Sequence, residues 1–487
     1  MKQAIAAFLL CLSLVLGGVA LAAHTLQEDA GQVAVTAISR QGDPAAAQGL
    51  VATQSCQYAQ TLLWDLTIPL DRPAQSTTAF SAQRDVPAAA NDDAGVYLRF
   101  PHQDATLSAE PGYFLDNLPT SPALGPLYEQ VARRTPPGQT RTEILNPSQF
   151  LDAYPLQVTL DLAGQSPDYS QAETFESQFD PSAQEAFQAF FRFPFAPDTR
   201  WKVTVTKDQD GLLTQLAIAP TGEEFLTGTV STVGAHTAYF TLTPSTQTGS
   251  TLPDFQQVPG GYGLYRLRFL TGEGGRVQID PDSLEMVYPL DPRAVSVLSL
   301  TLSPQEDTLF LVTIQEGQTR CLVLDTETMD LRTAFSIPAG KPTQHLEASV
   351  SAEDEVLSRT QYDVTQVLPG ENCLLALGQE TFHFFSQTPE GHYQYRWSGR
   401  LPDGLLSFPV CNGEKLALGI YDGETLTTGL SLWIYDREGT ILYQGDYATS
   451  LEQVYGWHAA DADTLTTGSP VQVVERKDRA LTLSWKS

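Results

Sequence analysis

Short apolar runs of strand length, separated by turn residues, dominate the C-terminal half of the chain. From about residue 250 an apolar strand ends in an acidic or polar residue, and a turn and a further short strand follow, as in Leu322–Asp325 and then Leu331. Apolar runs bounded by Asp, Gly, Ser and Pro are typical of β-strands joined by tight turns. The closing residue recurs at Asp280, Asp325, Ser386, Asp436 and Glu475. These copies lie 39 to 61 residues apart, which brackets the period of about 40–50 residues in a propeller blade.

Further strands precede most of these landmarks. In the clearest copy, Val297–Leu302 leads through Ser303 and Pro304 to Leu309–Ile314. In another, Leu405–Val410 leads to Lys415–Ile420. Four strands per copy form a sheet with two apolar faces, and such a sheet has to stack on its neighbours. The pattern therefore predicts five candidate blades over residues 250–487.

The copy from Val297 to Phe335 resembles a blade of the YVTN/WD40-like bacterial propellers. The resemblance depends on Leu302-Ser303-Pro304 and on Val323–Thr328. It covers about residues 250–487 and implies a propeller-like fold. For the whole chain we expect a mainly β, propeller-like fold of six to eight four-stranded blades, with short helical insertions in the N-terminal half. Because such propellers include both binding scaffolds and enzymes, the resemblance implies a fold and little about function.

Residues 30–230 follow a less regular pattern. Strands are predicted at Val33–Ile38, Leu62–Ile68, Leu156–Leu162, Trp201–Thr206 and Leu212–Ile218. The spacing of apolar residues also predicts two helices. The first spans Leu124–Arg134, and the second follows Asp180-Pro181-Ser182, where a capping residue precedes a proline suited to the first turn. This region is either a small α+β domain or a set of further blades with helical insertions.

The first 23 residues predict export. A single Lys2 precedes twenty uncharged residues, Ala4–Ala23, and Ala20-Leu21-Ala22 matches a signal-peptidase cleavage site. A run of that length is also long enough to span a bilayer, so residues 1–23 are either a signal peptide or an N-terminal membrane anchor. Both interpretations place the rest of the chain outside the cytoplasm, extracellular or at the cell surface.

The charge balance narrows the range of partners. The 487 residues include 28 Lys and Arg against 57 Asp and Glu, a formal net charge of −29. An acidic surface repels phosphate backbones and anionic head groups, so we expect no nucleic-acid partner. Contact with a membrane is expected only through residues 1–23, if they are not cleaved. High net charge also favours a soluble monomer.

No motif of the chain predicts catalysis, a metal or a cofactor. There is no G-x-S-x-G, and the seven histidines form no metal-binding spacing. Asp208-Gln209-Asp210-Gly211 resembles the start of a calcium loop, but the position that would need a closing Glu is Ala219. A type I′ hairpin turn explains these residues better. The closing residues Asp280, Asp325 and Asp436 are likewise interpreted as hairpin-turn residues.

Four cysteines follow the predicted signal: Cys56, Cys321, Cys373 and Cys411. An even number in an exported chain is compatible with two disulfides. They are sparse and mostly embedded in apolar runs, which favours buried free thiols over bridges.

Aromatic residues provide the functional hypothesis. They crowd the repeat region, either as packing residues between blades or as binding anchors on blade loops. Small and polar neighbours place two stretches in loops or at strand ends, and the candidate binding residues there are Tyr421, Asp422, Tyr455, Trp457 and His458. The leading hypothesis is a non-enzymatic exported propeller that binds a protein, peptide or cell-envelope component. The alternative is an exported hydrolase or lyase with its site at the mouth of the propeller channel.

Overall fold

The computed structural model describes most of the chain from residue 33 onward. The described ranges are 33–58, 62–82, 95–99, 106–108, 124–161, 181–221, 227–244, 252–271, 277–339, 343–348, 356–378, 380–400, 405–406, 409–421, 429–450 and 477–486. The predicted signal or anchor, residues 1–23, lies outside them. Within these ranges no helix combines the length and the apolar composition that a bilayer crossing requires.

The chain divides into two compact units that do not coincide with the regions 30–230 and 250–487 predicted from the sequence. Unit 1 combines residues 1–91 with 368–375 and 380–487, and unit 2 consists of residues 92–367 and 376–379. N-terminal strands therefore belong to the same unit as the C-terminal repeats. The physical reason is strand pairing between the two ends of the chain.

One sheet of unit 1 contains a strand from the N-terminus. Its central strands follow one another in sequence, as predicted for a blade, and β1 is added at the outer edge by antiparallel pairing with β29. Of the predicted first strand, residues 405–410, the described residues form the short strands β25 and β26. The members of this sheet are β25 (Leu405–Leu406), β26 (Val410–Cys411), β27 (Leu416–Tyr421), β28 (Gly429–Tyr435), β29 (Ile441–Thr449) and β1 (Val35–Gly42).

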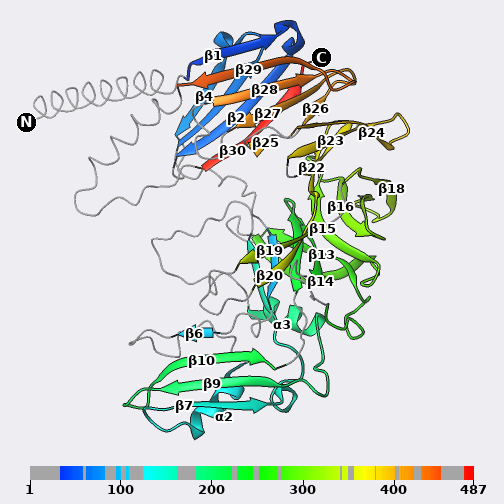
Figure 1. Ribbon diagram of the computed structural model, residues 1–487. Helices are drawn as coiled ribbons and strands as arrows, with labels where there is room; N and C mark the ends of the chain where they lie inside the picture. The colour runs from blue at the N-terminus through cyan, green and yellow to red at the C-terminus, as the bar shows by residue number, and fades with distance from the viewer. Residues whose placement is uncertain are drawn as a thin grey trace, which may run out of the picture. The chain divides into compact units, whose positions relative to one another are not determined.

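A second sheet of unit 1 is completed by the last strand of the chain. The strand β30 (Lys477–Trp485) pairs with β2 (Leu50–Tyr58), and β3 (Leu62–Pro69) and β4 (Thr77–Ala82) follow. Figure 1 shows the blue N-terminal strands among the orange and red C-terminal ones. The predicted fifth copy therefore needs a correction. Its second strand, around Leu483, lies opposite Ala52, while its first strand, residues 471–475, lies outside the described residues.

Apolar side chains from these two sheets form the core of unit 1. They include Leu66 and Ile68 from β3 together with Leu432 and Ile434 from β28, all fully buried. The hydroxyl of Tyr447 lies 3.0 Å from that of Tyr443 and donates to the carbonyl oxygen of Leu70 at 2.9 Å. Each sheet thus buries the apolar face that it could not shield alone.

The last two strands of a third sheet contribute aromatic packing to unit 1. This sheet has the order β21 (Val364–Gly370), β22 (Cys373–Gly378), β23 (Thr381–Gln387) and β24 (Tyr393–Arg400), and of its first two strands residues 368–370 and 373–375 belong to unit 1. Tyr435 of β28 packs against Trp397 and Phe382, with ring centroids 5.1 and 5.9 Å away. Gly439 is held at φ +88°, and a Cβ there would stand 2.7 Å from the Trp397 ring, so the turn after β28 can pass closely over the indole.

Two blade-like sheets lie in unit 2. One has the order β15 (Val295–Leu302), β16 (Thr308–Gln315), β17 (Gln318–Asp325) and β18 (Leu331–Ser336), which confirms the clearest predicted copy. The other consists of β11 (Thr227–Val233), β12 (Thr237–Pro244), β13 (Gly263–Thr271) and β14 (Val277–Pro289). Tyr239 and Leu264 of the second sheet share a core with Leu309 and Leu311 of the first.

Asp280 does not close a hairpin, contrary to the prediction. The strand β14 continues through it, and the pairing with β13 shifts register between Arg266 and Arg268. The hydroxyl of Ser283 donates to the carbonyl oxygen of Asp280 at 2.6 Å. The polar residues after Asp280 therefore form an irregularity within one long strand rather than a turn between two.

The remaining elements of unit 2 confirm both predicted helices. The helix α2 (Gly125–Arg134) buries Leu127, Tyr128 and Val131, and α3 (Pro181–Phe190) begins at the expected proline and buries Phe187. α2 contacts β9 in a sheet with the order β6-β10-β9-β7, and α3 contacts β14. The remaining strands of unit 2 are β5 (Gly95–Arg99), β6 (Thr106–Ser108), β7 (Thr140–Leu145), β8 (Gln157–Asp161), β9 (Trp201–Lys207), β10 (Leu213–Pro220), β19 (Thr343–Ala348) and β20 (Val356–Gln361).

The mainly β, propeller-like prediction is confirmed. The described residues form five four-stranded sheets, one six-stranded sheet and two two-stranded sheets, all antiparallel in their named pairings. The segment Val297–Phe335, which carries the resemblance to bacterial propellers, lies in one four-stranded sheet.

The packing of unit 1 predicts that two side-chain truncations to alanine lower the stability of the protein by different amounts. Leu432→Ala removes a fully buried side chain, whereas Ile441→Ala removes one that is 47% exposed on the neighbouring strand. We expect Leu432→Ala to lower the free energy of unfolding by about 2–5 kcal/mol, and Ile441→Ala by less than about 1 kcal/mol. Urea unfolding followed by circular dichroism measures both. Equal losses would contradict the assignment of Leu432 to the core.

Candidate functional site

A cavity of unit 1 lies where turns and strand ends from three sheets meet. Its volume is about 890 Å³. Its walls include Glu371 and Asn372 between β21 and β22, residues 411–416 between β26 and β27, and residues 436–438 after β28. Trp485 and Lys486, at the end of β30, complete the wall. Turns and strand ends of three sheets thus reach the same cavity, and blade loops are where propellers bind partners.

The turn between β26 and β27 is held by its own asparagine. Asn412 Oδ1 accepts hydrogen bonds from the backbone N–H groups of Glu414 at 3.1 Å and Lys415 at 2.9 Å. Gly413 adopts φ +87°, a left-handed conformation that glycine accommodates without strain. Arg437 Nε donates to the carbonyl oxygen of Gly413 at 2.7 Å, which ties this turn to the one after β28. The wall is therefore built by local hydrogen bonds.

Lys415 joins the wall to the N-terminal strands. Its Nζ donates to the carbonyl oxygen of Ala46 at 3.3 Å and lies 5.9 Å from the centre of the Trp485 ring. A cation over an indole face contributes about 0.5–1 kcal/mol at an exposed site. This contact brings together residues that are 369 positions apart in the chain.

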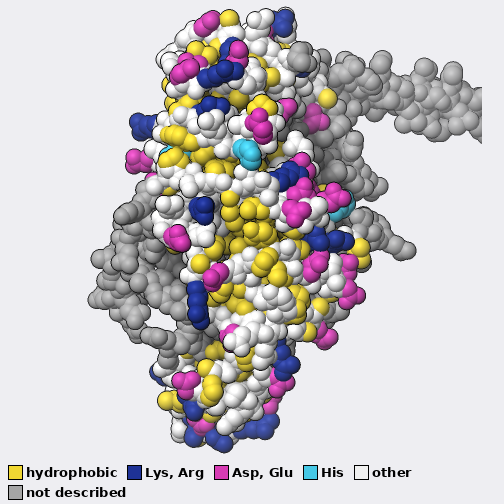
Figure 2. Space-filling model, turned by 90° about the vertical axis from the view of Figure 1, so that its right-hand side faces the viewer, with side chains coloured by type: hydrophobic (Ala, Val, Ile, Leu, Met, Phe, Trp, Pro, Cys, Tyr) yellow, Lys and Arg dark blue, Asp and Glu magenta, His cyan; other side chains and the backbone are white. Residues whose placement is uncertain are grey.

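The charge of the cavity differs from that of the chain. Four basic side chains line it, Arg396, Lys415, Arg437 and Lys486, and so do four acidic ones, Glu371, Glu414, Asp436 and Glu438. The whole chain has twice as many acidic as basic residues. On the face shown in Figure 2, both signs of charge are interspersed. Four amide side chains, Gln48, Asn372, Gln387 and Asn412, add hydrogen-bonding groups to the cavity wall.

The structure places the backbone of one predicted binding residue and does not test the binding role of any of them. Tyr421 is the last residue of β27, where its backbone pairs with Leu405. Its side chain lies outside the described part of the structure, as do Asp422, Tyr455, Trp457 and His458. These residues stay predictions.

Lys415, Arg437 and Trp485 are not among the binding residues predicted from the sequence. The asparagine–glycine turn at Asn412 was the available signal, since it marks a short loop at a strand end. Three other aromatics of the repeat region, Tyr262, Tyr265 and Trp397, serve packing, because they are buried.

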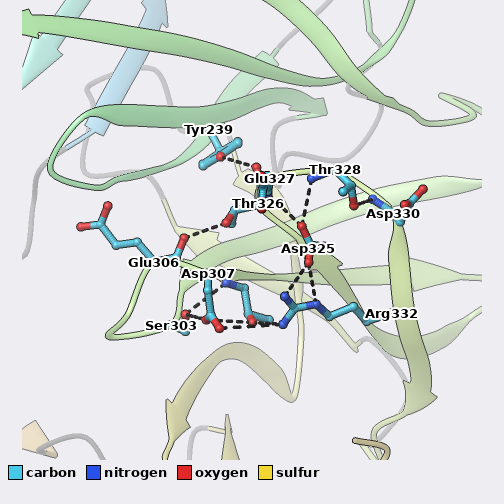
Figure 3. Close-up of polar contacts among 11 residues, drawn as sticks. Tyr239, Ser303, Glu306, Asp307, Asp325, Thr326, Glu327, Thr328, Asp330 and Arg332 are labelled. Carbon is cyan, nitrogen blue, oxygen red and sulfur yellow. Dashed lines mark hydrogen bonds and ion pairs between the residues drawn. The ribbon is translucent and has the colours of Figure 1, made fainter.

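The acidic turn of the clearest blade forms a polar network in unit 2, shown in Figure 3. Asp325 Oδ1 accepts hydrogen bonds from the backbone N–H groups of Glu327 and Thr328, both at 2.9 Å. Arg332 Nε donates to Asp325 Oδ2 at 3.1 Å, and its Nη1 donates to the hydroxyl of Thr308 at 2.7 Å. The hydrogen bond from Thr328 and the Arg332 guanidinium hold the pKa of Asp325 at about 2. Asp325 is thus a turn residue, as predicted.

The same role applies to two further aspartates. Asp436 Oδ1 accepts from the N–H groups of Glu438 and Thr440 at 3.0 and 2.8 Å. Asp208 Oδ1 accepts from those of Asp210 and Leu212 at 3.0 and 2.8 Å. The type I′ assignment at Asp208 is wrong, because Gly211 is the turn residue with positive φ, whereas type I′ requires it at both central residues.

Three of the four cysteines have described side chains, and all three are free thiols. Cys321 and Cys373 are buried, as predicted, while Cys411 is half-buried and lies on the cavity wall. The side chain of Cys56 lies outside the described residues.

Comparisons with known proteins find a likeness only among solved structures. No family model and no curated protein matches the chain. The similar structures include β-propeller proteins. The β-propeller domain of Swd1 from Myceliophteria thermophila is 13% identical, with a TM-score of 0.22 over 50% of this chain and 69% of that one. A putative 6-phosphogluconolactonase from Bacteroides uniformis is 10% identical, with a TM-score of 0.27 over 81% and 95%.

A protein from Lactobacillus plantarum is 6% identical, with a TM-score of 0.23 over 51% of this chain. The chain spans 65% of the length of that protein. At these scores the fold assignment depends on the sheets themselves, and no activity is transferred from any of these proteins.

The network in Figure 3 predicts that the stability difference between the wild type and an Asp325 variant depends on pH. The folded-state pKa of Asp325 is about 2, below the value of about 3.9 in an unfolded chain. Its contribution is therefore fully present above about pH 4 and is lost as the pH falls towards 2. We expect Asp325→Asn to melt below the wild type at pH 7 and this gap to narrow between pH 4 and pH 2. Calorimetry across this range measures the gap, and a constant gap would contradict the assignment.

Proposed function

We propose that the protein is an exported, propeller-like binding protein that recognises a peptide segment of a protein or cell-envelope partner in the cavity of unit 1. The observation that carries this proposal is the meeting of turns from three sheets around a cavity of about 890 Å³. This volume is in the range of pockets that enclose small ligands. Such a cavity accommodates a short stretch of an extended chain.

The lining supports a peptide ligand. Peptides present backbone amides, charged side chains of both signs and apolar groups. The cavity offers amide side chains, four cations, four carboxylates and the aromatic rings of Phe384 and Trp485. A cavity with interspersed charges of both signs selects ligands by the positions of their charges rather than by their net charge. A ligand whose charges are misplaced meets like charges on the cavity wall and binds less tightly.

Export is part of the same proposal. Its support is the uncharged run Ala4–Ala23 and the cleavage pattern Ala20-Leu21-Ala22. An acidic surface and the expected monomeric state suit a soluble domain outside the cytoplasm, either released or held by its N-terminal segment.

A comparison of two charge-neutral double variants tests the binding site. Lys486→Ala with Glu414→Ala removes one cation and one carboxylate from the cavity wall. The matched control is Arg133→Ala with Glu129→Ala, an exposed ion pair on α2. Peptides are selected from a linear phage library on the wild-type protein, and their dissociation constants are measured by calorimetry.

We expect the cavity variant to weaken binding by about tenfold, because a hydrogen bond to a charged group contributes about 1.5 kcal/mol. The α2 control should bind as the wild type does. Selected peptides that bind both variants with wild-type affinity would show that the cavity is not the binding site.

The proposed export predicts a defined N-terminus. We expect mass spectrometry of the protein from its native host to find a mature chain that starts at Ala23, because the cleavage pattern ends at Ala22. An intact N-terminus in the membrane fraction would support the anchor instead. An intact N-terminus in the cytoplasm would refute export.

A further inference from the structure

Two cysteines that are distant in sequence lie side by side in unit 1. Cys373 is the first residue of β22, and Cys411 is the last residue of β26. Just before them, Glu371 pairs with Val410 in a parallel bridge. Cys373 Sγ lies 4.0 Å from the carbonyl oxygen of Pro409, two residues before Cys411, and each thiol shifts the pKa of the other. The pairing of two sheet edges thus creates a pair of thiols.

A glycine makes this approach possible. A Cβ at Gly370 would stand 2.1 Å from the carbonyl oxygen of Pro409 and 2.8 Å from Cys373 Sγ. Both distances are shorter than atoms tolerate, so any larger residue would push the two segments apart. Gly370 therefore maintains the close spacing of the thiols.

The two thiols differ in environment. Cys373 is fully buried, whereas Cys411 is half-buried and lines the cavity. The backbone N–H of Gly413 donates to Cys411 Sγ at 3.4 Å. A hydrogen bond from Cys373, the Gly413 N–H and the cations Arg437 and Arg396 lower the pKa of Cys411 to about 7, against the opposing effect of burial. The pKa of Cys373 is raised, first by its hydrogen bond with Cys411 and then by burial.

The charged groups around the pair come from several elements. Arg396 lies on β24, Arg437 in the turn after β28 and Glu371 between β21 and β22. The other ionisable residues of the cavity wall are Glu414, Lys415, Asp436, Glu438 and Lys486. The nucleophile in thiol chemistry is the thiolate, and it forms most readily beside cations and N–H donors. Cys411 meets these conditions.

Cys321 provides an internal contrast. It is buried in β17, and burial raises its pKa above the usual range. It has neither a cavity nor a second thiol among its described contacts. An isolated thiol of this kind behaves as a small apolar side chain and is inert.

We propose that Cys411 and Cys373 form a redox-active dithiol that reacts with small-molecule disulfides entering the cavity. In the first step the Cys411 thiolate attacks one sulfur of the incoming disulfide. The incoming sulfur–sulfur bond breaks, one thiolate leaves and a mixed disulfide forms on Cys411. Cys373 then transfers its proton to the departing thiolate and attacks Cys411 Sγ, which releases the second thiolate. The two protein thiols are oxidised to one disulfide, and the incoming disulfide is reduced to two thiols.

This inference is independent of peptide binding, but it affects the same cavity. A Cys373–Cys411 disulfide would attach the turn at Asn412 covalently to β22. In an oxidising compartment outside the cytoplasm, that bridged form would be the resting state.

Peptide mapping tests the chemistry directly. The full chain is reduced, treated with oxidised glutathione, quenched and digested with trypsin without reduction. Trypsin places Cys373 in residues 360–396, Cys411 in residues 401–415 and Cys321 in residues 321–332. We expect a disulfide between the first two peptides and an unmodified third. In Cys373→Ser, glutathione should stay attached to Cys411, and in Cys411→Ser no adduct should form on Cys373.

A glutathione adduct on wild-type Cys411 without the cross-link would overturn the proposal, as would a Cys411 that does not react at all. Because these outcomes are read from the wild-type chain, they do not depend on whether either variant folds.

Alkylation rates test the environment of Cys411. We expect the rate of Cys411 alkylation by iodoacetamide to rise with pH, with a midpoint near pH 7. In a synthetic peptide of residues 401–415 the midpoint should lie at about pH 8.5. At pH 7 the folded chain should react about threefold faster, because a larger thiolate fraction outweighs a lower intrinsic nucleophilicity. Arg437→Ala should raise the midpoint and Arg133→Ala should not. Identical midpoints for the chain and the peptide would contradict the inference.

Discussion

The structure of unit 1 depends on backbone pairing between the two ends of the chain. β30 completes the sheet of β2, β3 and β4, and β1 extends the sheet that ends in β29. A sheet edge without a partner exposes unpaired N–H and C=O groups, and a single sheet leaves its apolar faces in water. Pairing of the two termini addresses both problems at once. It also makes the stability of the unit a property of the whole chain rather than of its repeats taken singly.

The cavity is a consequence of that pairing. Its walls are turns and strand ends of three different sheets, and Trp485 belongs to one of these sheets because β30 pairs with β2. The contact of Lys415 with Ala46 and Trp485 then joins the N-terminal segment, a central turn and the last strand. Local hydrogen bonds such as those of Asn412 shape each wall, while strand pairing decides which walls face one another.

The same arrangement explains why Cys373 and Cys411 lie in a different environment from the third described cysteine, Cys321. Cys373 and Cys411 begin or end strands at sheet edges that meet, and Gly370 allows them to approach. Cys321 lies inside a strand whose neighbours bury it completely. The three thiols thus acquire different environments from their position relative to a sheet edge and a cavity.

The sequence by itself determined the local elements. The four strands of the clearest blade, the helices over Leu124–Arg134 and after Asp180, and the turns at Asp208, Asp325 and Asp436 all follow from apolar periodicity and turn residues, which act over a few positions. Only the tertiary structure decided that Leu483 lies opposite Ala52, that Asp280 interrupts a strand without ending it, and that Cys373 lies beside Cys411. Each of these depends on which strands pair across hundreds of residues. Apolar periodicity specifies that a strand needs a partner, but it does not specify which one, because backbone hydrogen bonds are the same for every strand.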